Sequence, residues 1–525
     1  MSNPHLHDEL AKFPERLTVT TQYGPVIGGR AANGAAVFLE IPYALPPARF
    51  EDPRPLPDEF RYEDREFIRE TRYCVQPTND GQARDTPFED KVGLGAPSED
   101  PLFLNIVTPP SFPSKSGFPV KVYIHGGFLQ FGSPHTLGSQ AQYVAATREE
   151  VWVNIGYRLS AFGFLASDKP QLMGNYGFKD QWIALEWIKE NIAAFGGNPD
   201  DIQVTGLSAG AHSVHQLLHR ASHLPDGLNA PFTSAILQSN AILTTPQTPE
   251  EHRQQFNALC RALKLDPDSP DILAILQDPV RVPWSSITHV IETDILGAYG
   301  TFRGCLSDDW IPSSPDPMAW QCSGGFARGL REHGVRSIVV GDVSEEWYLY
   351  SIAHSIQTPG DICPNLRRYF PEKVVNGFLD NWRELGEDAE SEEAQKKYGE
   401  ILSCGQVYLP VRLLARDLLE AGFPVLRYTI QWTPEQSRVK GYVTHGTDRS
   451  LWALRIPTLE PDQIDAAERW LERIDNETKE IEVLGKPARD VRHALTLGEG
   501  RIIEWRDDSR WDEIMVLRKI LPGER

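Results

Sequence analysis

Short apolar runs alternate with helix-like segments along most of this chain. The runs lie at residues 120–124, 151–155, 202–205, 234–237, 335–340 and 424–430. Between two of them, Trp182, Leu185 and Ile188 recur at helical spacing, so we expect the segment around them to be an amphipathic helix. Short apolar strands that alternate with helices predict a mostly parallel sheet with helices on both faces. The predicted fold class is therefore α/β.

The N-terminal end of this pattern and one inner segment are less regular. Near the N-terminus, two strand-like runs flank Tyr23, Gly24 and Pro25, which predicts an opening β-hairpin. The segment 244–334 shows no clear periodicity, and we assign no secondary structure to it. Because no repeat, low-complexity tract or linker interrupts the sequence, we expect a single domain over residues 1–525.

Charge limits the partners that this chain can bind. It contains 52 Lys plus Arg and 73 Asp plus Glu, which gives a formal charge of −21. Nucleic acid and anionic membrane surfaces are not expected as partners, because both require clustered cations. No window approaches the roughly 18 uninterrupted apolar residues of a membrane-spanning helix. The N-terminal residues contain no apolar core, so we expect no secretory leader and a cytoplasmic location.

Metal and redox sites find little support in the sequence. The six cysteines are widely spaced and form no CxxC motif, so neither a zinc ribbon nor a thioredoxin-type site is indicated. His212, His215 and His219 share one face of an expected helix, a spacing that could suit a metal. No acidic residue or cysteine accompanies them, and we interpret them as histidines of the core or of its edge. We expect neither a metal nor a cofactor.

The motif Gly206-Leu207-Ser208-Ala209-Gly210 lies between an expected strand and an expected helix. In this context a GxSxG turn exposes its serine above the carboxyl edge of a sheet. Small residues two positions before and after Ser208 let the strand and the helix approach closely. The first N–H groups of the helix then point toward the negative charge that develops during acyl transfer. Ser208 is therefore the candidate nucleophile.

A second glycine motif lies upstream of the first. His125, Gly126, Gly127 and Phe128 directly follow the expected strand at 120–124. An HGGG-type loop in this position supplies backbone N–H groups to an oxyanion hole. An ordinary Gly-Gly turn is the alternative interpretation.

The partners of Ser208 are expected in the chain order serine, acid, histidine. The expected strand at 335–340 ends just before Asp342, Glu345 and Glu346, and position alone allows any of these three as the acid. That carboxylate would hold the histidine in the correct tautomer and stabilise its imidazolium form.

Three downstream histidines compete for the role of the base. His354 follows the acid too closely to lie on a separate loop, and His493 lies in a helix-like run. His445 stands in a loop after the last expected strand, and we expect it to be the base. It would take the proton of Ser208 and return it to the leaving group.

Further stretches of the chain form an ordered series: FLEIPYA at 38–44, SEDPLFLN at 98–105, YRL at 157–159, FGFL at 162–165, NYG at 175–177 and NIAAFGGNP at 191–199. Together with the serine motif, this series resembles the type-B carboxylesterase family, which contains cholinesterases, liver-type carboxylesterases and fungal lipases. The resemblance extends over nearly the whole chain. It implies an α/β-hydrolase fold, with a small N-terminal hairpin and a mostly parallel sheet, in one domain.

The resemblance also implies roles for particular residues. The nucleophile falls on Ser208 and the base on His445, and the acid falls on Glu346, which matches the glutamate of the family's GxNxDEG stretch. The donors of the oxyanion hole fall on Gly127, Phe128 and Ala209.

The chain departs from the family's pattern close to the reacting serine. Phe128 replaces the third oxyanion glycine, and if that position needs a positive φ, a non-glycine residue costs about 1–2 kcal/mol. Leu207 replaces the usual glutamate and makes the site more apolar. Pro101 replaces a cysteine, so Cys74 loses its usual disulfide partner, which fits a reducing compartment. No tryptophan lies between these two positions, so recognition of choline loses its main aromatic platform.

Substrate specificity is expected to depend on Phe128, Phe131 and Leu207, and on the loops at 81–95 and 287–317. The sequence favours a hydrolase that cleaves a small-molecule carboxylic ester through a serine acyl-enzyme. One alternative is a tailoring enzyme that uses the same triad on a specific ester, lactone or thioester, for acyl transfer or cyclisation. A non-catalytic binding protein is the other. These patterns carry no information on the oligomeric state.

Overall fold

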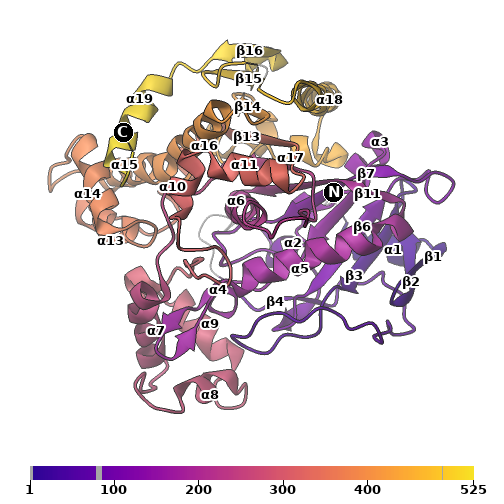
Figure 1. Cartoon of the computed structure of the whole chain (residues 1–525), viewed down its shortest axis with the longest axis horizontal. Helices are drawn as coiled ribbons and strands as arrows, with labels where there is room; N and C mark the ends of the chain where they lie inside the picture. The colour runs from indigo at the N-terminus through magenta and orange to yellow at the C-terminus, as the bar shows by residue number, and fades with distance from the viewer. Residues whose placement is uncertain (1–3, 79–85, 488, 525) are drawn as a thin grey trace.

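The computed structural model describes residues 4–78, 86–487 and 489–524 (Figure 1). Within these residues, a twelve-stranded sheet has the strand order β1-β2-β3-β6-β8-β7-β11-β12-β13-β14-β15-β16. Neighbouring strands from β8 to β15 pair in parallel, and antiparallel strands flank this block on both sides. The strands are β1 (Arg16–Thr21), β2 (Gly24–Arg30), β3 (Ala36–Pro42), β6 (Phe103–Thr108), β7 (Phe118–Ile124), β8 (Val151–Ile155), β11 (Gly197–Leu207), β12 (Ser234–Gln238), β13 (Ser337–Val343), β14 (Val425–Ile430), β15 (His493–Leu497) and β16 (Ile503–Asp507).

Alternating side chains of the central strands divide the interior into two cores. In β12, Ala235 and Leu237 pack into one core and Ile236 into the other. Helices α5 (Tyr176–Asn191), α6 (Ala209–Ala221) and α16 (Leu409–Glu420) cover the first core, and α3 (Gln142–Arg148), α17 (Arg449–Trp452) and α18 (Pro461–Leu484) cover the second. Because both faces are covered, the central strands are mainly apolar, and this produced the short runs in the sequence. The predicted α/β-hydrolase fold is confirmed.

Most of the expected elements are present. Strands β1 and β2 form the antiparallel opening hairpin, and α5 followed by a 3-10 turn to Phe195 accounts for the expected helix. The expectation of a helix around His493 was wrong, because this residue begins β15. β15 pairs in parallel with β14, which lies far earlier in the chain, and antiparallel with β16, which follows it directly. These pairings outweigh the local helix-like pattern.

About half of the segment 244–334, which had no assignment, is helical. It contains α7 (Pro249–Ala262), α8 (Ile272–Gln277), α9 (Trp284–Glu292), α10 (Pro317–Cys322) and α11 (Gly325–Glu332). Helices α7, α8 and α9 lie together beside the sheet, at the lower left of Figure 1. A capping box formed by Thr248 and Glu251 begins α7.

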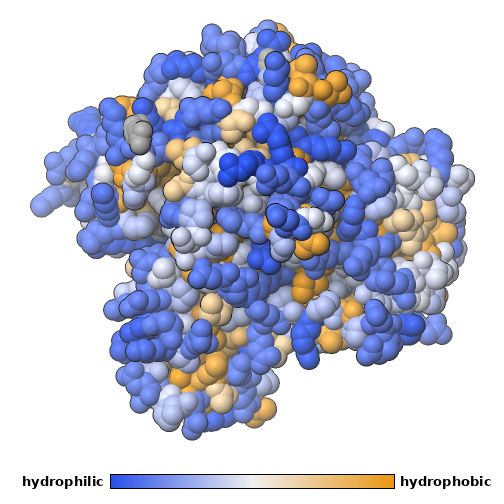
Figure 2. All heavy atoms as spheres, in the orientation of Figure 1, coloured by the Kyte–Doolittle hydropathy of each residue, from blue (hydrophilic) through white to orange (hydrophobic). Residues whose placement is uncertain are grey.

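The remaining elements are short helices and strands that surround the sheet. They are α1 (Leu6–Lys12), α2 (Phe88–Val92), α4 (Ser160–Phe164), α12 (Trp347–Ser351), α13 (Ile362–Leu366), α14 (Glu372–Asn381), α15 (Ser391–Ser403), α19 (Trp511–Met515), β4 (Arg72–Cys74), β5 (Ala96–Ser98), β9 (Ser167–Asp168) and β10 (Gln171–Leu172). The face of the molecule in Figure 2 is mainly hydrophilic, with apolar residues in scattered patches. Among the described helices, none is both long and apolar enough to cross a lipid bilayer.

Candidate active site

Ser208 stands at the sharp turn between β11 and α6. Its φ of 60° and ψ of −127° are a combination that a non-glycine residue rarely adopts. The flanking glycines make this turn possible, because a Cβ atom on Gly210 would lie 2.1 Å from the oxygen of Ile124. The N–H of Ser208 donates to the carbonyl of Gln238 in β12 at 2.9 Å, which fixes the turn on the sheet.

Glu346 and His445 meet at the carboxyl edge of the sheet. His445 Nδ1 donates to Glu346 Oε2 at 2.6 Å. The Glu346 side chain is fully buried just after β13, and its second oxygen accepts from the N–H of Val343 at 3.1 Å. This charge-assisted hydrogen bond holds the imidazole in one tautomer and leaves Nε2 as the proton acceptor. Within the described residues Nε2 bonds to no protein atom, and the imidazole lines the same cavity as Ser208.

The two other candidate acids are engaged elsewhere. Asp342 accepts from Arg412 Nη1 at 3.0 Å, and Glu345 accepts from the N–H of Val443 at 2.8 Å. Of the three carboxylates that sequence position allowed, Glu346 is therefore the one that contacts a histidine in the described part of the chain.

The two other candidate bases also lie away from Ser208. His354 Nε2 is 2.7 Å from the hydroxyl of Tyr369, and burial lowers the pKa of His354 to about 3. His493 lies near the edge of the sheet, 3.0 Å from a carboxylate oxygen of Asp507. Neither histidine lines the cavity that contains Ser208.

The loop after β7 has three consecutive residues with positive φ. Gly127, Phe128 and Leu129 have φ values of 112°, 55° and 66°, so the strained left-handed position anticipated for Phe128 is present. Within the described residues, the N–H groups of Gly127 and Phe128 donate to no protein acceptor. The N–H of Ala209 belongs to the first turn of α6, where N–H groups have no partner within the helix. The N–H groups of Gly127, Phe128 and Ala209 are thus without a protein acceptor in the described residues, and all three residues line cavities that Ser208 also lines.

The cavity at Ser208 has a volume of about 470 Å³. Its wall includes the three residues expected to shape the pocket, which are Phe128, Phe131 and Leu207. Phe88 and Val92 from the expected 81–95 loop also line it, whereas residues 81–85 lie outside the described residues. The pocket is therefore mixed, with aromatic and aliphatic side chains around a polar centre.

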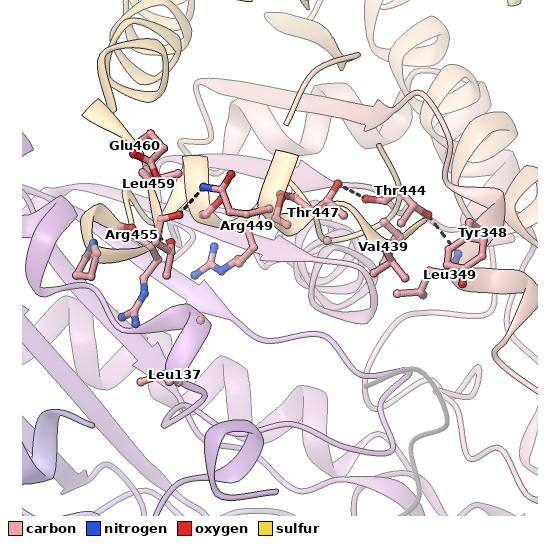
Figure 3. Close-up of a pocket in the computed structure, with 18 of the residues that line it drawn as sticks. Leu137, Tyr348, Leu349, Val439, Thr444, Thr447, Arg449, Arg455, Leu459 and Glu460 are labelled. Carbon is pink, nitrogen blue, oxygen red and sulfur yellow. Dashed lines mark hydrogen bonds between the residues drawn. The ribbon is translucent and has the colours of Figure 1, made fainter. Parts of the chain in front are cut away.

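A second cavity of about 780 Å³ adjoins the first at His445 (Figure 3). His445, Gly446 and Leu349 line both cavities. Arg449 and Arg455 direct their guanidinium groups to the same side in Figure 3. His445 therefore lies where the two cavities meet.

Tyr350 is a neighbour of the site that sequence reasoning missed. It lies on α12, four residues after Glu346, and its ring centroid is 5.1 Å from that of His445. Burial, and then the charge of Glu346, raise the pKa of Tyr350 well above its ordinary value, so the phenol stays neutral. The Ser208 hydroxyl lowers the pKa of Tyr350, but by less than these two effects raise it. The four-residue spacing from Glu346 on a helix was the signal that could have identified it.

The three histidines of α6 are buried, as expected for core residues. His215 Nε2 contacts Gln321 Oε1 at 2.8 Å, and its Nδ1 accepts from the N–H of Ile242 at 2.9 Å. Burial lowers the pKa of His215 to about 4. In the ranges that the structure describes, no group of three or more His, Cys, Asp or Glu side chains is arranged to hold a metal ion.

The chain is similar to a known protein family and to several known proteins. The model of the carboxylesterase family matches residues 15–477. An uncharacterised esterase/lipase of Schizosaccharomyces pombe is 28% identical over 515 residues, which cover 93% of this chain and 92% of that protein. A carboxylic ester hydrolase of Gibberella moniliformis is 31% identical and covers 83% of this chain and 81% of its own length. Liver carboxylesterase B-1 of Rattus norvegicus is 37% identical, with coverage of 80% and 76%.

Solved structures agree at the level of the fold. A structure of PNB esterase superimposes with a TM-score of 0.75 over 96% of this chain and 100% of that chain. The two sequences are 23% identical in this comparison, so the match supports the architecture alone.

Proposed function

Because this chain belongs to the carboxylesterase family and is a hydrolase of carboxylic esters, we propose that Ser208 is its nucleophile and carries the acyl-enzyme. His445 is the general base in this proposal, and Glu346 orients it. The observation that carries the proposal is the 2.6 Å hydrogen bond between His445 Nδ1 and Glu346 Oε2, with Nε2 left for the serine proton.

Acylation of the serine is the first half of the reaction. His445 Nε2 takes the proton of Ser208 while Oγ attacks the ester carbonyl, and Glu346 stabilises the resulting imidazolium. The imidazolium then gives this proton to the alcohol oxygen, the carbon–oxygen bond breaks, and the acyl group stays on Ser208. The 780 Å³ cavity beside His445 supports placing the alcohol part on that side (Figure 3).

The tetrahedral intermediate needs donors for its oxyanion. In this proposal the N–H groups of Gly127, Phe128 and Ala209 supply them, helped by the positive end of the α6 dipole. One such donor typically contributes about 3–4 kcal/mol to transition-state stabilisation. The free N–H groups of Gly127 and Phe128 support this role.

Deacylation repeats the same proton transfers with water. His445 takes a proton from a water molecule, whose oxygen attacks the acyl carbon. The imidazolium then returns the proton to Ser208 Oγ as the carboxylic acid leaves. No cofactor or metal takes part in either step of this proposal.

Replacement of the nucleophile tests the proposal. Ser208→Ala is expected to lose roughly a thousandfold or more of the rate of methyl butanoate hydrolysis, because the acyl-enzyme cannot form. Ser323→Ala, at an exposed serine far along the chain, is the matched control. A fluorophosphonate probe should label the wild-type protein and the control but not Ser208→Ala. Equal hydrolysis by wild type and Ser208→Ala would contradict the assignment.

A narrower use of the same site, on one particular ester, has support of its own. Phe128 contacts Tyr350 and Tyr369, each at 6.0 Å between ring centroids, and so closes the space beside Ser208. A restricted acyl site favours a restricted set of substrates. The rates at which the enzyme hydrolyses a series of esters from methyl acetate to methyl hexanoate measure this restriction. Similar rates across the series would favour an esterase of broad specificity.

We also propose that the enzyme works in the cytoplasm, on small molecules rather than on nucleic acid or membranes. All six cysteines are free thiols, and the charge of −21 opposes binding to polyanions. Fractionation of the source cells with an antibody to this chain tests the location.

A further inference from the structure

Two arginines line the cavity of about 780 Å³ beside His445. Arg455 lines this cavity, and Arg449 lines both this cavity and the one at Ser208. Within the described residues, neither arginine forms an ion pair. Pockets that bind small molecules usually have volumes of about 300–1,000 Å³, so the cavity has room for the alcohol part of an ester. Unpaired arginines stand out in a chain with a formal charge of −21.

Arg455 is a covered cation that the cavity can still reach. The residue is only 3% exposed, and its Nη1 donates one long hydrogen bond, at 3.4 Å, to Gln140 Oε1. Its Nε and Nη2 form no hydrogen bond in the described part of the chain, and both atoms keep some accessible surface. Because Arg455 is otherwise buried and lines the cavity, this free edge is open to the cavity. An arginine keeps its charge in proteins, and a covered charge without a partner is costly.

The guanidinium groups of Arg449 and Arg455 lie near each other. Figure 3 shows both of them directed toward the side of Leu137, which lines the same cavity. Burial lowers the pKa of Arg455 to about 10, Tyr143 opposes this effect, and the nearby charge of Arg449 lowers the pKa further. Like charges at close range repel each other, so an anion beside the two groups would relieve this repulsion.

Hydrogen-bond donors around the two arginines lack acceptors. Arg449 stacks on Tyr123, with its guanidinium carbon 3.7 Å from the ring centre, and its Nε donates to Ser139 Oγ at 3.3 Å. Its Nη1 and Nη2 are buried and, among the described residues, bond to no acceptor. The same holds for Gln140 Nε2 and Ser450 Oγ. Proteins leave few buried donors unsatisfied, so this surplus of donors indicates an acceptor from outside the chain.

The carboxylates near the pair are engaged elsewhere. Glu9, whose charge reaches Arg455, accepts from a backbone N–H at 3.1 Å and from a glutamine amide at 3.4 Å. Asp448, next to Arg449 in the chain, accepts from an indole N–H at 2.9 Å. Glu460 lines the cavity, but its side chain caps the N-terminus of α18. An anionic ligand would therefore displace no ion pair of the described residues.

We propose that Arg455 binds a carboxylate on the alcohol part of the substrate, so that the preferred substrates are esters of ω-hydroxy carboxylic acids. The inference rests on the proposed function, in which Ser208 attacks the ester and the alcohol part occupies the cavity beside His445. Nε and Nη2 of an arginine are parallel donors that match the two oxygens of a carboxylate. Both are free in Arg455, and Arg449 adds a second positive charge nearby.

The separation of Arg455 from His445 determines the length of the alcohol part. In Figure 3, Arg455 and Thr444, which directly precedes His445, stand at different ends of the cavity wall. A carboxylate directly beside the ester oxygen would not reach Arg455. The alcohol part is therefore expected to be a chain of several carbons with the carboxylate at its far end.

A matched series of esters tests this inference. Acetate esters of the ω-hydroxy acids from butanoic to decanoic acid carry the terminal carboxylate, and the corresponding primary amides are neutral and of nearly the same shape. The reacting ester group is the same in each pair, so a difference in rate reports on the far end of the chain. At the best chain length, the wild-type enzyme is expected to hydrolyse the acid with a kcat/KM higher than that of the amide by roughly tenfold or more, measured by acetate release.

Variants assign the preference to Arg455. Arg455→Met should reduce the ratio of the two kcat/KM values to about one, and Arg455→Lys should keep part of it. Arg469→Met removes the same charge from an exposed, ion-paired position on α18 and should keep the wild-type ratio. The free ω-hydroxy acid should inhibit the wild-type enzyme roughly tenfold more strongly than its amide, which gives a readout if Arg455→Met does not fold.

The outcomes separate this inference from the proposed function. Equal kcat/KM values for acid and amide at every chain length, or equal losses for both in Arg455→Met, would overturn the role of Arg455. Hydrolysis of both kinds of ester by Ser208→Ala would overturn the nucleophile instead, and inhibition by the free hydroxy acid would still report on Arg455.

Discussion

The ring of Tyr350 packs edge-on against the imidazole of His445, with centroids 5.1 Å apart and ring planes at 67°. The same ring lies edge-on to Phe128 at 6.0 Å. Tyr350 therefore connects the proposed base with the oxyanion loop and restricts the positions that the imidazole can take. The contact depends on the ring and does not require the hydroxyl.

Tyr350→Ala is expected to lower kcat for simple esters by roughly tenfold or more, because His445 gains freedom to turn away from the serine. It should also lower the free energy of unfolding by about 3–5 kcal/mol, since a fully buried ring is lost. Tyr350→Phe keeps the ring and should remain much closer to the wild type in both measurements. Steady-state kinetics and urea unfolding measure the two effects, and similar kinetics for the two variants would contradict the positioning role.

Glu346→Gln should reduce kcat by about a thousandfold to ten-thousandfold, because an amide favours the wrong histidine tautomer and does not stabilise the imidazolium. Glu345→Gln is the neighbouring control, since a glutamine oxygen can still accept from the N–H of Val443. Rates of methyl butanoate hydrolysis give the comparison. A similar loss in both variants would mean that the loop, and not the Glu346 carboxylate, is responsible.

Phe128→Gly should broaden the acyl specificity. The change removes a ring that closes the space beside Ser208, and it relieves about 1–2 kcal/mol of backbone strain at a φ of 55°. The ratio of kcat/KM for methyl hexanoate to that for methyl acetate is expected to rise by roughly tenfold. Phe131→Gly serves as a comparison from the same cavity wall, where no positive φ is relieved. An unchanged ratio in Phe128→Gly would show that another group limits the chain length.

Asp448 links stability to pH. Its side chain is fully buried, Oδ2 accepts from Trp452 Nε1 at 2.9 Å, and burial, then the charge of Glu346, raise the pKa of Asp448 to about 6. A raised carboxyl pKa gives stability that is present below about pH 4 and lost as the pH rises through 6. The total loss is at most about 3 kcal/mol.

Asp448→Asn cannot ionise but can still accept from Trp452. Its stability relative to wild type should therefore increase between about pH 4 and pH 6 and stay constant above this range. Thermal unfolding across this range measures the effect, with the exposed Asp388→Asn as a control. A difference that does not vary with pH would show that Asp448 does not titrate in this window.

The sequence predicted the parts of the site that depend on local spacing. A serine between two glycines, after a strand and before a helix, has few possible conformations, so Ser208 could be placed without coordinates. The choice between Glu346 and its neighbours needed the family resemblance, because three carboxylates share one loop. In the structure, Asp342 and Glu345 have other partners.

Long-range contacts account for what the sequence could not predict. His493 was expected in a helix, but it begins β15, where it pairs with Asp507 of β16, and the rest of β15 pairs with the distant strand β14. The loop at 287–317 was expected to shape the pocket. Arg303 from this loop lines a cavity of about 10 Å³ beside Ser208, and nothing in the sequence of the loop singled this residue out. The position of that arginine depends on Gln130 and Asn175, which lie more than a hundred residues away.

Gln130 and Asn175 hold the segment around Arg303 through backbone atoms alone. Gln130 bonds to the N–H and carbonyl groups of Phe302, and Asn175 bonds to those of Cys305. Every residue except proline carries both of these groups, so a different side chain at any of these positions keeps the attachment. The side chains of Phe302, Arg303 and Cys305 can therefore be exchanged one at a time in the laboratory while the path of the backbone is retained.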